Sequence, residues 1–198
     1  MTVTARLIPG FLFVASTVAA AVLALPPVAA QTQKESFTGF AINMNSGPTT
    51  ATVDFTIERW STDAERERLL SILKEEKNSM RANQQLLSAL QSMPKVGYIR
   101  TQNTLAWDLR YANQSPLGNG GRRIVLGTDR PVGFREAANQ SRTMDYPFTI
   151  VEMQLDKDGK GVGKILAGTK LLIDKNNTLA LENYGQQPIR FNEIRPLK

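Results

Sequence analysis

Two aspartates one residue apart, Asp156 and Asp158, begin the stretch DKDGKG and are the clearest candidates for metal chemistry. An EF-hand calcium loop starting at Asp156 needs oxygen ligands at its first, third and fifth positions, glycine at the sixth and a bidentate glutamate at the twelfth. The glycine is present, but Lys160 stands at the fifth position and Ala167 at the twelfth. Strand-like patterns also flank the stretch, where an EF-hand has helices. We therefore predict a hairpin turn centred on Asp158 and Gly159, and no metal site.

The chain contains no histidine and no cysteine. A Ser-His-Asp triad, a Cys-His pair and the usual histidine-containing zinc or copper sites are therefore impossible within one chain, and no disulfide can form. Catalysis would need paired carboxylates, a Ser-Lys dyad, a tyrosine or a metal held by oxygen ligands. These exclusions favour a non-catalytic function, and we expect no cofactor.

Arginines and carboxylates concentrate between residues 100 and 145, around the stretch WDLRY. On a strand, its two aromatic residues and Leu109 share one face, and its aspartate and arginine share the other. A barrel lumen lined by the charged pair would hold a polar or anionic ligand, whereas the aromatic face would hold an apolar ligand or form core. The charges can equally be surface ion pairs that contribute little stability. The candidate ligand-binding residues are Arg100, Trp107, Asp108, Arg110, Tyr111, Arg123 and Arg130.

Residues 1–30 have the pattern of a secretory signal peptide. Arg6 is their single charge, residues 7–25 are mostly apolar, and the small residues of VAA end at Ala30. An uncleaved membrane anchor is the alternative, because the apolar stretch approaches the length that spans a bilayer. We expect cleavage after Ala30, no membrane span after cleavage, and one β-rich domain over residues 31–198 in the periplasm or outside the cell.

The formal net charge is +6, from 24 lysines and arginines against 18 aspartates and glutamates. Moderate basicity of this kind favours anionic surfaces weakly. The charges are interspersed along the chain, and an exported protein rarely meets nucleic acid. We therefore expect no nucleic-acid partner.

Strand patterns come first after the leader, in residues 36–45 and 51–60. In the second, Val53, Phe55 and Ile57 alternate with polar residues, which puts the apolar set on one face. The Ser-Gly-Pro stretch between the two segments predicts a hairpin.

Two helical patterns follow, one after Thr62 and one ending before Pro94. Thr62 and Glu65 have the spacing of a capping box, and leucines recur at helical intervals in both segments. We expect the pair to cover one end or face of a sheet. A partner-binding or membrane-binding face is the alternative.

The rest of the chain returns to strand patterns. Residues 113–121 have the composition of a loop, and residues 129–147 show no clean period. The stretch GTDRP, residues 127–131, predicts a turn in which Asp129 pairs with a nearby arginine. Residues 188–196, bounded by prolines, predict an edge strand. The other predicted strands cover residues 96–101, 104–112, 122–128, 148–156, 161–174 and 178–185.

The predicted fold class is mainly β (α+β). We expect an antiparallel meander of seven or eight strands, barrel-like or strongly curved, with a two-helix insertion after the second strand.

The stretches ERWSTDAER, GYIRT, LAWDLRYA, GGRRIVLGTDRP and DYPFTIVEMQLDKDGKG, with LENYG towards the C-terminus, resemble a family of small exported bacterial proteins of unknown function. The resemblance covers most of the chain after residue 30. It implies an exported single domain and implies no reaction, ligand or catalytic residue.

Three functions agree with these patterns. The first is a secreted, non-catalytic domain that binds a small or anionic ligand in its barrel or beneath residues 129–147. The second is a module that binds an envelope protein through an open sheet edge or the second helix. The third is a carboxylate-dependent enzyme acting on an envelope polymer, which needs two facing carboxylates among Asp54, Asp108, Glu152 and Glu182. The sequence favours the first.

Overall fold

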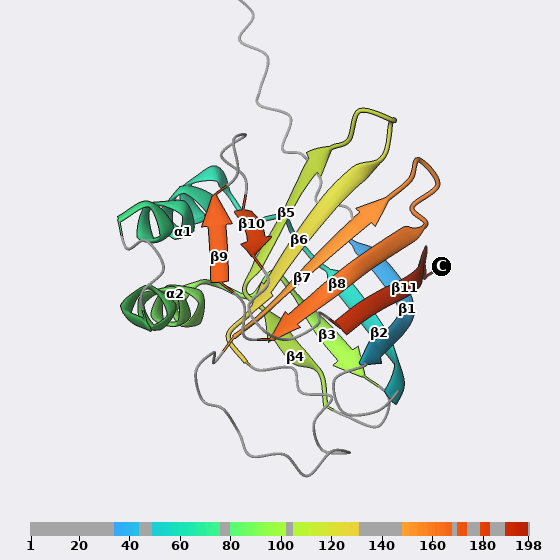
Figure 1. Cartoon of the computed structure of the whole chain (residues 1–198), viewed down its shortest axis with the longest axis horizontal. Coiled ribbons are helices and arrows are strands. Elements are labelled where there is room, and N and C mark those ends of the chain that lie inside the picture. Colours follow the sequence, from blue (N-terminus) through green and yellow to red (C-terminus); the bar gives the residue numbers. More distant parts are fainter. Residues whose placement is uncertain are drawn as a thin grey trace, which may run out of the picture. The chain divides into compact units, whose positions relative to one another are not determined.

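Figure 1 presents a computed structural model of the chain. The described residues belong to a unit spanning residues 32–198. The predicted signal peptide lies outside them and stays a prediction. No helix in the part of the chain that the structure describes is long and apolar enough to cross a membrane. The structure describes residues 34–43, 49–75, 80–101, 105–130, 148–167, 170–173, 179–182 and 189–197.

Nine strands form one antiparallel sheet in the order β4-β3-β2-β1-β11-β8-β7-β6-β5, and β9 and β10 pair separately (Figure 1). The main-sheet strands are β1 (Glu35–Asn43), β2 (Thr49–Ile57), β3 (Gly97–Thr101), β4 (Trp107–Leu109), β5 (Tyr111–Pro116), β6 (Arg122–Thr128), β7 (Thr149–Leu155), β8 (Gly161–Ala167) and β11 (Ile189–Pro196). The separate pair is β9 (Lys170–Ile173) and β10 (Leu179–Glu182), and the helices are α1 (Asp63–Glu75) and α2 (Met80–Ser92). The prediction of a mainly β meander with two helices after the second strand is confirmed.

The sheet nearly closes into a barrel because its two outermost strands are consecutive in the chain. β4 pairs with β3, where Leu109 faces Gly97, and β5 pairs with β6, where Tyr111 faces Gly127. Between them the Arg110 N–H donates to the carbonyl of Gly127 at 2.8 Å. One run of chain therefore pairs with β3 and then with β6, and we call this junction the seam.

The seam corrects two sequence predictions. The strand predicted over residues 104–112 is divided at Arg110, and its second half continues to Pro116, into the predicted loop of residues 113–121. Loop composition was misleading there because the polar residues of β5 pair with β6 along their backbone.

Apolar side chains fill the described interior of the barrel. Val53, Phe55 and Ile57 are fully buried, so the predicted alternation of β2 is confirmed. The rings of Phe55 and Phe191 meet edge to face at 5.2 Å between centroids. The inner core consists of Phe37, Ala41, Val53, Phe55, Ile57, Val96, Ile99, Leu109, Ala112, Ile124, Leu126, Val151, Met153, Leu155, Ile165, Ile189, Phe191 and Ile194.

A second core joins the helices to the outer face of β5, β6 and β7. The prediction that the helical pair covers a face of the sheet is therefore confirmed. Tyr111 lies in this outer core while its neighbour Ala112 lies in the inner one. The expected common face of Trp107, Leu109 and Tyr111 is thus wrong, because the seam shifts the alternation by one residue. The outer core consists of Leu69, Leu70, Leu86, Ala89, Leu90, Met93, Tyr111, Val125, Phe148 and Ile150.

β11 was expected at an edge and instead lies between β1 and β8. Pro196 does not interrupt the pairing because it is the last residue of the strand. A shift in register between Phe191 and Ile194, with Glu193 at φ 52°, keeps both apolar side chains inside the barrel. The strand predicted over residues 161–174 is also divided, since β8 belongs to the main sheet and β9 pairs with β10.

The DKDGKG stretch is the predicted hairpin turn, between β7 and β8. Oδ1 of Asp156 accepts hydrogen bonds from the backbone N–H groups of Asp158 and Lys160, both at 2.9 Å. Gly159 has φ 75°, which glycine adopts without strain. The first aspartate therefore caps backbone groups in the turn. Among the described residues, no three acidic side chains gather as metal ligands would.

Candidate functional site

The seven candidate residues lie in several places. Arg100 is on the outer face of β3, 60% exposed, with Nη2 3.5 Å from Oδ2 of Asp54. Arg123 pairs with Glu152 at 2.8 Å on the outer face of β6 and β7. Arg130 is exposed just beyond β6. These three arginines do not line the barrel interior.

Asp108 and Arg110 are brought together at the seam. Oδ2 of Asp108 lies 3.4 Å from Nη2 of Arg110, and its Oδ1 lies 3.3 Å from Nζ of Lys95. Nε of Arg110 is buried and lies 3.4 Å from Oδ2 of Asp129, within ion-pair distance but without the alignment of a hydrogen bond. The predicted pairing of Asp129 with an arginine is confirmed. Because Arg110 serves two carboxylates and also donates to the Met93 carbonyl, it acts as a structural cation.

The two aromatic candidates contribute to packing. Trp107 is partly buried against the inner core, and Tyr111 is 3% exposed beneath the helices. Burial raises the pKa of the Tyr111 hydroxyl to about 12. A hydroxyl that keeps its proton so firmly is a poor general base at neutral pH.

The carboxylates considered for an enzyme each have a cationic partner where the structure describes their side chains. Asp54 pairs with Arg100 and accepts a hydrogen bond from Thr38 at 2.7 Å. Glu152 pairs with Arg123. The side chain of Glu182 lies outside the described residues. These ion pairs give no support to a facing pair of free carboxylates.

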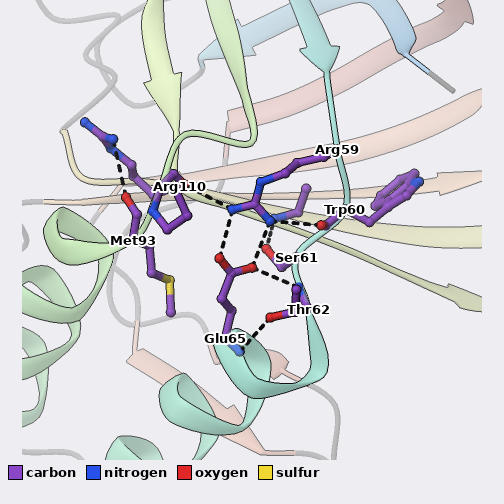
Figure 2. A network of polar contacts seen from close by, with 9 residues as sticks. Arg59, Trp60, Ser61, Thr62, Glu65, Met93 and Arg110 are labelled. Carbon is purple, nitrogen blue, oxygen red and sulfur yellow. Dashed lines mark hydrogen bonds and ion pairs between the residues drawn. The ribbon is translucent and has the colours of Figure 1, made fainter. Parts of the chain in front are cut away.

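Figure 2 shows how the start of α1 is fixed beside the seam. Arg59 makes a bidentate pair with Glu65, at 3.0 and 2.8 Å. Oε2 of Glu65 also accepts the Thr62 N–H at 2.8 Å, and Oγ1 of Thr62 accepts the Glu65 N–H at 3.2 Å. The predicted capping box is thereby confirmed. The hydrogen bond from Arg59 holds the pKa of the Glu65 carboxyl below its usual value.

Both ends of the helical insertion are tied to the seam. At its start, Ser61 donates its N–H to the carbonyl of Ala112 at 2.8 Å, and its Oγ accepts the N–H of Ala112 at 3.0 Å. At its end, the Met93 carbonyl accepts from Arg110 at 3.4 Å (Figure 2). Sequence reasoning missed Arg59 and Ser61 because neither stands in a helical or strand spacing to its partner.

One end of the barrel is crossed by an ion pair between strands that are not neighbours. Arg122 of β6 binds Glu35 of β1 in a bidentate pair and Gln114 of β5 at 2.9 Å. Its guanidinium group also lies 5.7 Å from the ring centroid of Phe37, part of the inner core. This contact covers the interior at that end.

A solvent-open groove of about 520 Å³ lies between α1 and α2. Among the residues that the structure describes, its lining combines two guanidinium groups, two amides and two hydroxyls with two apolar side chains, and includes no carboxylate. Ser92 donates its hydroxyl hydrogen to the carbonyl of Ala89 at 2.7 Å, which leaves its oxygen as an acceptor. The lining residues are Arg68, Ile72, Arg81, Gln84, Gln85, Ser88, Ala89 and Ser92.

The groove suits a ligand that carries negatively charged oxygens. A guanidinium group presents paired N–H donors that match a carboxylate or a phosphate. The whole of α2, MRANQQLLSALQS, has no acidic residue, so its solvent face does not repel an anion. The absence of acidic residues from α2 can be seen in the sequence, but polar residues on a helix ordinarily indicate nothing more than a solvated face.

No protein-family model, curated protein or solved structure matches this chain.

Proposed function

We propose that this chain is an exported, non-catalytic β-barrel domain that binds an anionic ligand in the groove between α1 and α2. The observation that carries the proposal is the composition of the groove, where Arg68 and Arg81 stand among neutral hydrogen-bonding side chains and the described lining holds no carboxylate. The barrel and its seam then serve as the scaffold that fixes the helices.

The charged residues elsewhere in the described chain favour the groove over the other ligand sites considered. The described barrel interior is apolar, which disfavours a charged ligand there. Arg110 and Arg123 are committed to carboxylates of the chain itself. Arg68 and Arg81 line an open groove, and none of the lining residues that the structure describes is a carboxylate.

The expected affinity is modest. Hydrogen bonds to charged groups contribute about 1.5–3 kcal/mol each, and an open groove leaves part of that interaction screened by water. A single carboxylate or phosphate should therefore bind with a Kd on the order of 0.1–1 mM. Affinity should fall as salt is added, because the attraction is between exposed charges.

Amide chemical-shift mapping of the isotope-labelled exported protein tests the proposal. Galacturonate and inorganic phosphate are the anionic probes, and galactose is the neutral control. We expect the anions to shift amides of α1 and α2, and the Arg68→Gln/Arg81→Gln variant to lose those shifts. The matched control, Arg190→Gln/Arg195→Gln, removes the same charge from exposed positions of β11 and should bind normally. Equal loss in both variants, or anion-induced shifts confined to the barrel, would overturn the proposal.

A further inference from the structure

We infer that Asn119, at the tip of the hairpin between β5 and β6, is a site of spontaneous modification, where the side-chain amide becomes an acid through a cyclic imide. The reaction involves neither the groove between the helices nor any ligand, so it goes beyond the proposed function. Asn119 is the only asparagine of the chain that is followed by glycine. Asparagine is also one of the thermally labile residue types.

The loop around Asn119 is held more firmly at its base than at its tip. At the base, the Leu117 N–H donates to the carbonyl of Gly121 at 2.8 Å. At the tip, the Gly120 N–H donates to the carbonyl of Leu117 at 3.2 Å, which is the long end of the usual range. Gly120 has φ 78°, as the last residue of a three-residue hairpin loop commonly does. The nitrogen of Gly120 is therefore tied to the loop by a long hydrogen bond.

The side-chain amide of Asn119 is arranged for attack by that nitrogen. Its Oδ1 accepts the backbone N–H of Gly121 at 3.1 Å. This hydrogen bond stabilises the negative charge that develops on the oxygen when a nucleophile adds to the amide carbon. Because the bond reaches from residue 119 to residue 121, it also folds the amide over the peptide nitrogen of Gly120. Attack by this nitrogen closes a five-membered ring.

The tip of the hairpin has room for the ring to form. A Cβ at Gly118 or at Gly120 would meet no atom within 4 Å, and both glycines are exposed together with Asn119. Gly121 is instead buried, and a Cβ there would clash with the carbonyl oxygen of Leu155. The tip can therefore change its conformation and admit water while the base of the hairpin stays fixed.

The reaction needs only water and hydroxide. Hydroxide takes the proton of the Gly120 N–H, and the nitrogen forms a bond to Cγ of Asn119. The bond between Cγ and Nδ2 breaks, and the amide nitrogen takes a proton from water and leaves as ammonia. Water then adds to either ring carbonyl and opens the ring, which gives aspartate or isoaspartate. Each product replaces a neutral amide with a carboxylate, so the formal net charge falls by one.

The hairpin between β7 and β8 provides a comparison within the same chain. Its loop has the same pair of backbone hydrogen bonds, from Asp156 to Lys160 and from Gly159 to Asp156, and Gly159 has φ 75°. The residue before this glycine is Asp158, whose ionised carboxylate resists a nucleophile. A Cβ at Gly159 would also lie 2.9 Å from Cγ of Pro196, so this tip has less room. Ring closure should therefore be slower there than at Asn119.

Incubation of the purified protein at neutral and mildly alkaline pH, followed by peptide mass spectrometry, tests the inference. We expect the peptide that contains Asn119 to accumulate aspartate and isoaspartate, faster at the higher pH, and the intact protein to elute earlier from a cation-exchange column. Asn113, which lies in β5 and precedes a glutamine, is the internal control and should react at least about tenfold more slowly. Gly120→Ala should slow the conversion about tenfold, because a side chain crowds the attacking nitrogen. Circular dichroism checks that the protein and the variant are folded.

Three results would overturn the inference. The first is conversion of Asn119 in an isolated peptide of residues 113–122 but not in the folded protein, since the fold would then protect the amide. The second is equal conversion of Asn119 and Asn113, which would leave the turn without a role. The third is an equal rate in the wild type and in Gly120→Ala, which would contradict attack by the nitrogen of Gly120.

Discussion

The barrel interior and the helical insertion use opposite chemistry on the same chain. The interior is built from apolar residues that are almost completely buried, and an ion pair between Arg122 and Glu35 crosses one end. The insertion buries one face of each helix on the barrel and exposes amides, hydroxyls and guanidinium groups on the other. The difference indicates that stability resides mainly in the barrel, and it agrees with our proposal that the solvent face of the helices binds the ligand.

The largest expected effect comes from emptying the interior. Phe191→Ala should lower the free energy of unfolding by about 3–5 kcal/mol, because a fully buried aromatic ring leaves a cavity. Urea denaturation measures the loss. Arg190→Ala, next in the chain but exposed, is the control and should change stability by less than about 0.5 kcal/mol. Similar losses in the two variants would contradict the account of the interior.

High pH should weaken the attachment of the insertion through Tyr111. Because its pKa is raised to about 12, the stability that its protonated form contributes is complete below the ordinary value of 10.0 and is lost as pH rises through about 12. A shift of this size corresponds to about 2–3 kcal/mol.

Measuring the free energy of unfolding as a function of pH, for the wild type and for Tyr111→Phe, gives this contribution. The two curves should diverge only above the ordinary tyrosine pKa of 10.0, with the wild type falling further. Parallel curves throughout would mean that the hydroxyl is not buried beneath the helices.

An added methyl group tests how tightly the interior is packed. A Cβ at Gly39 would lie 2.8 Å from two ring carbons of Phe191 and 2.9 Å from the carbonyl oxygen of Asn192. Gly39→Ala should therefore lower stability by about 1–3 kcal/mol through overpacking. Thermal unfolding provides the measurement, with Gly118→Ala as a control because a Cβ at Gly118 meets no atom within 4 Å. A neutral Gly39→Ala would show that the ring has room to move.

The contact between the insertion and the seam should have a smaller effect. A double-mutant cycle of Arg59→Ala and Glu65→Ala should give a coupling free energy of about 0.5–1 kcal/mol, because the pair is partly exposed. The pKa of Glu65 is lowered in the folded state, so this coupling is complete above its ordinary value of 4.5 and is lost as pH falls through the folded value. A coupling that stayed constant into acid would contradict the assigned ion pair.

The smallest effect on stability is expected in the groove. Arg68→Gln/Arg81→Gln should alter the free energy of unfolding by less than about 0.5 kcal/mol per site while removing anion binding. Denaturation and titration of the same preparation measure both quantities. A large stability loss together with the binding loss would place these arginines in the scaffold.

The parts of the fold that depend on local pattern could be predicted from the sequence. The alternation of β2, the capping box of Thr62 and Glu65, and the turn at Asp156 each involve residues close together in the chain. The face of the sheet on which Tyr111 lies could not be predicted, because it depends on the seam at Arg110. The seam exists only because β4 and β5 pair with two different strands, β3 and β6. The central place of β11 likewise depends on β1 and β8.

The candidate site was less predictable than the fold. Clustering of arginines in the sequence drew attention to residues 100–130, where Arg110 and Arg123 neutralise carboxylates of the folded chain. The groove combines Arg68 of α1 with residues of α2, and their juxtaposition depends on how the two helices pack. Side-chain type alone could not distinguish these arginines from others on the surface.

The most direct test of the central claim is the amide shift map of residues 31–198 titrated with galacturonate. The account predicts shifts on α1 and α2 around Arg68, Arg81 and Gln85, with the inner-core amides unchanged and the effect absent from Arg68→Gln/Arg81→Gln. Shifts centred on the inner core, or a map that the double variant leaves intact, would contradict it.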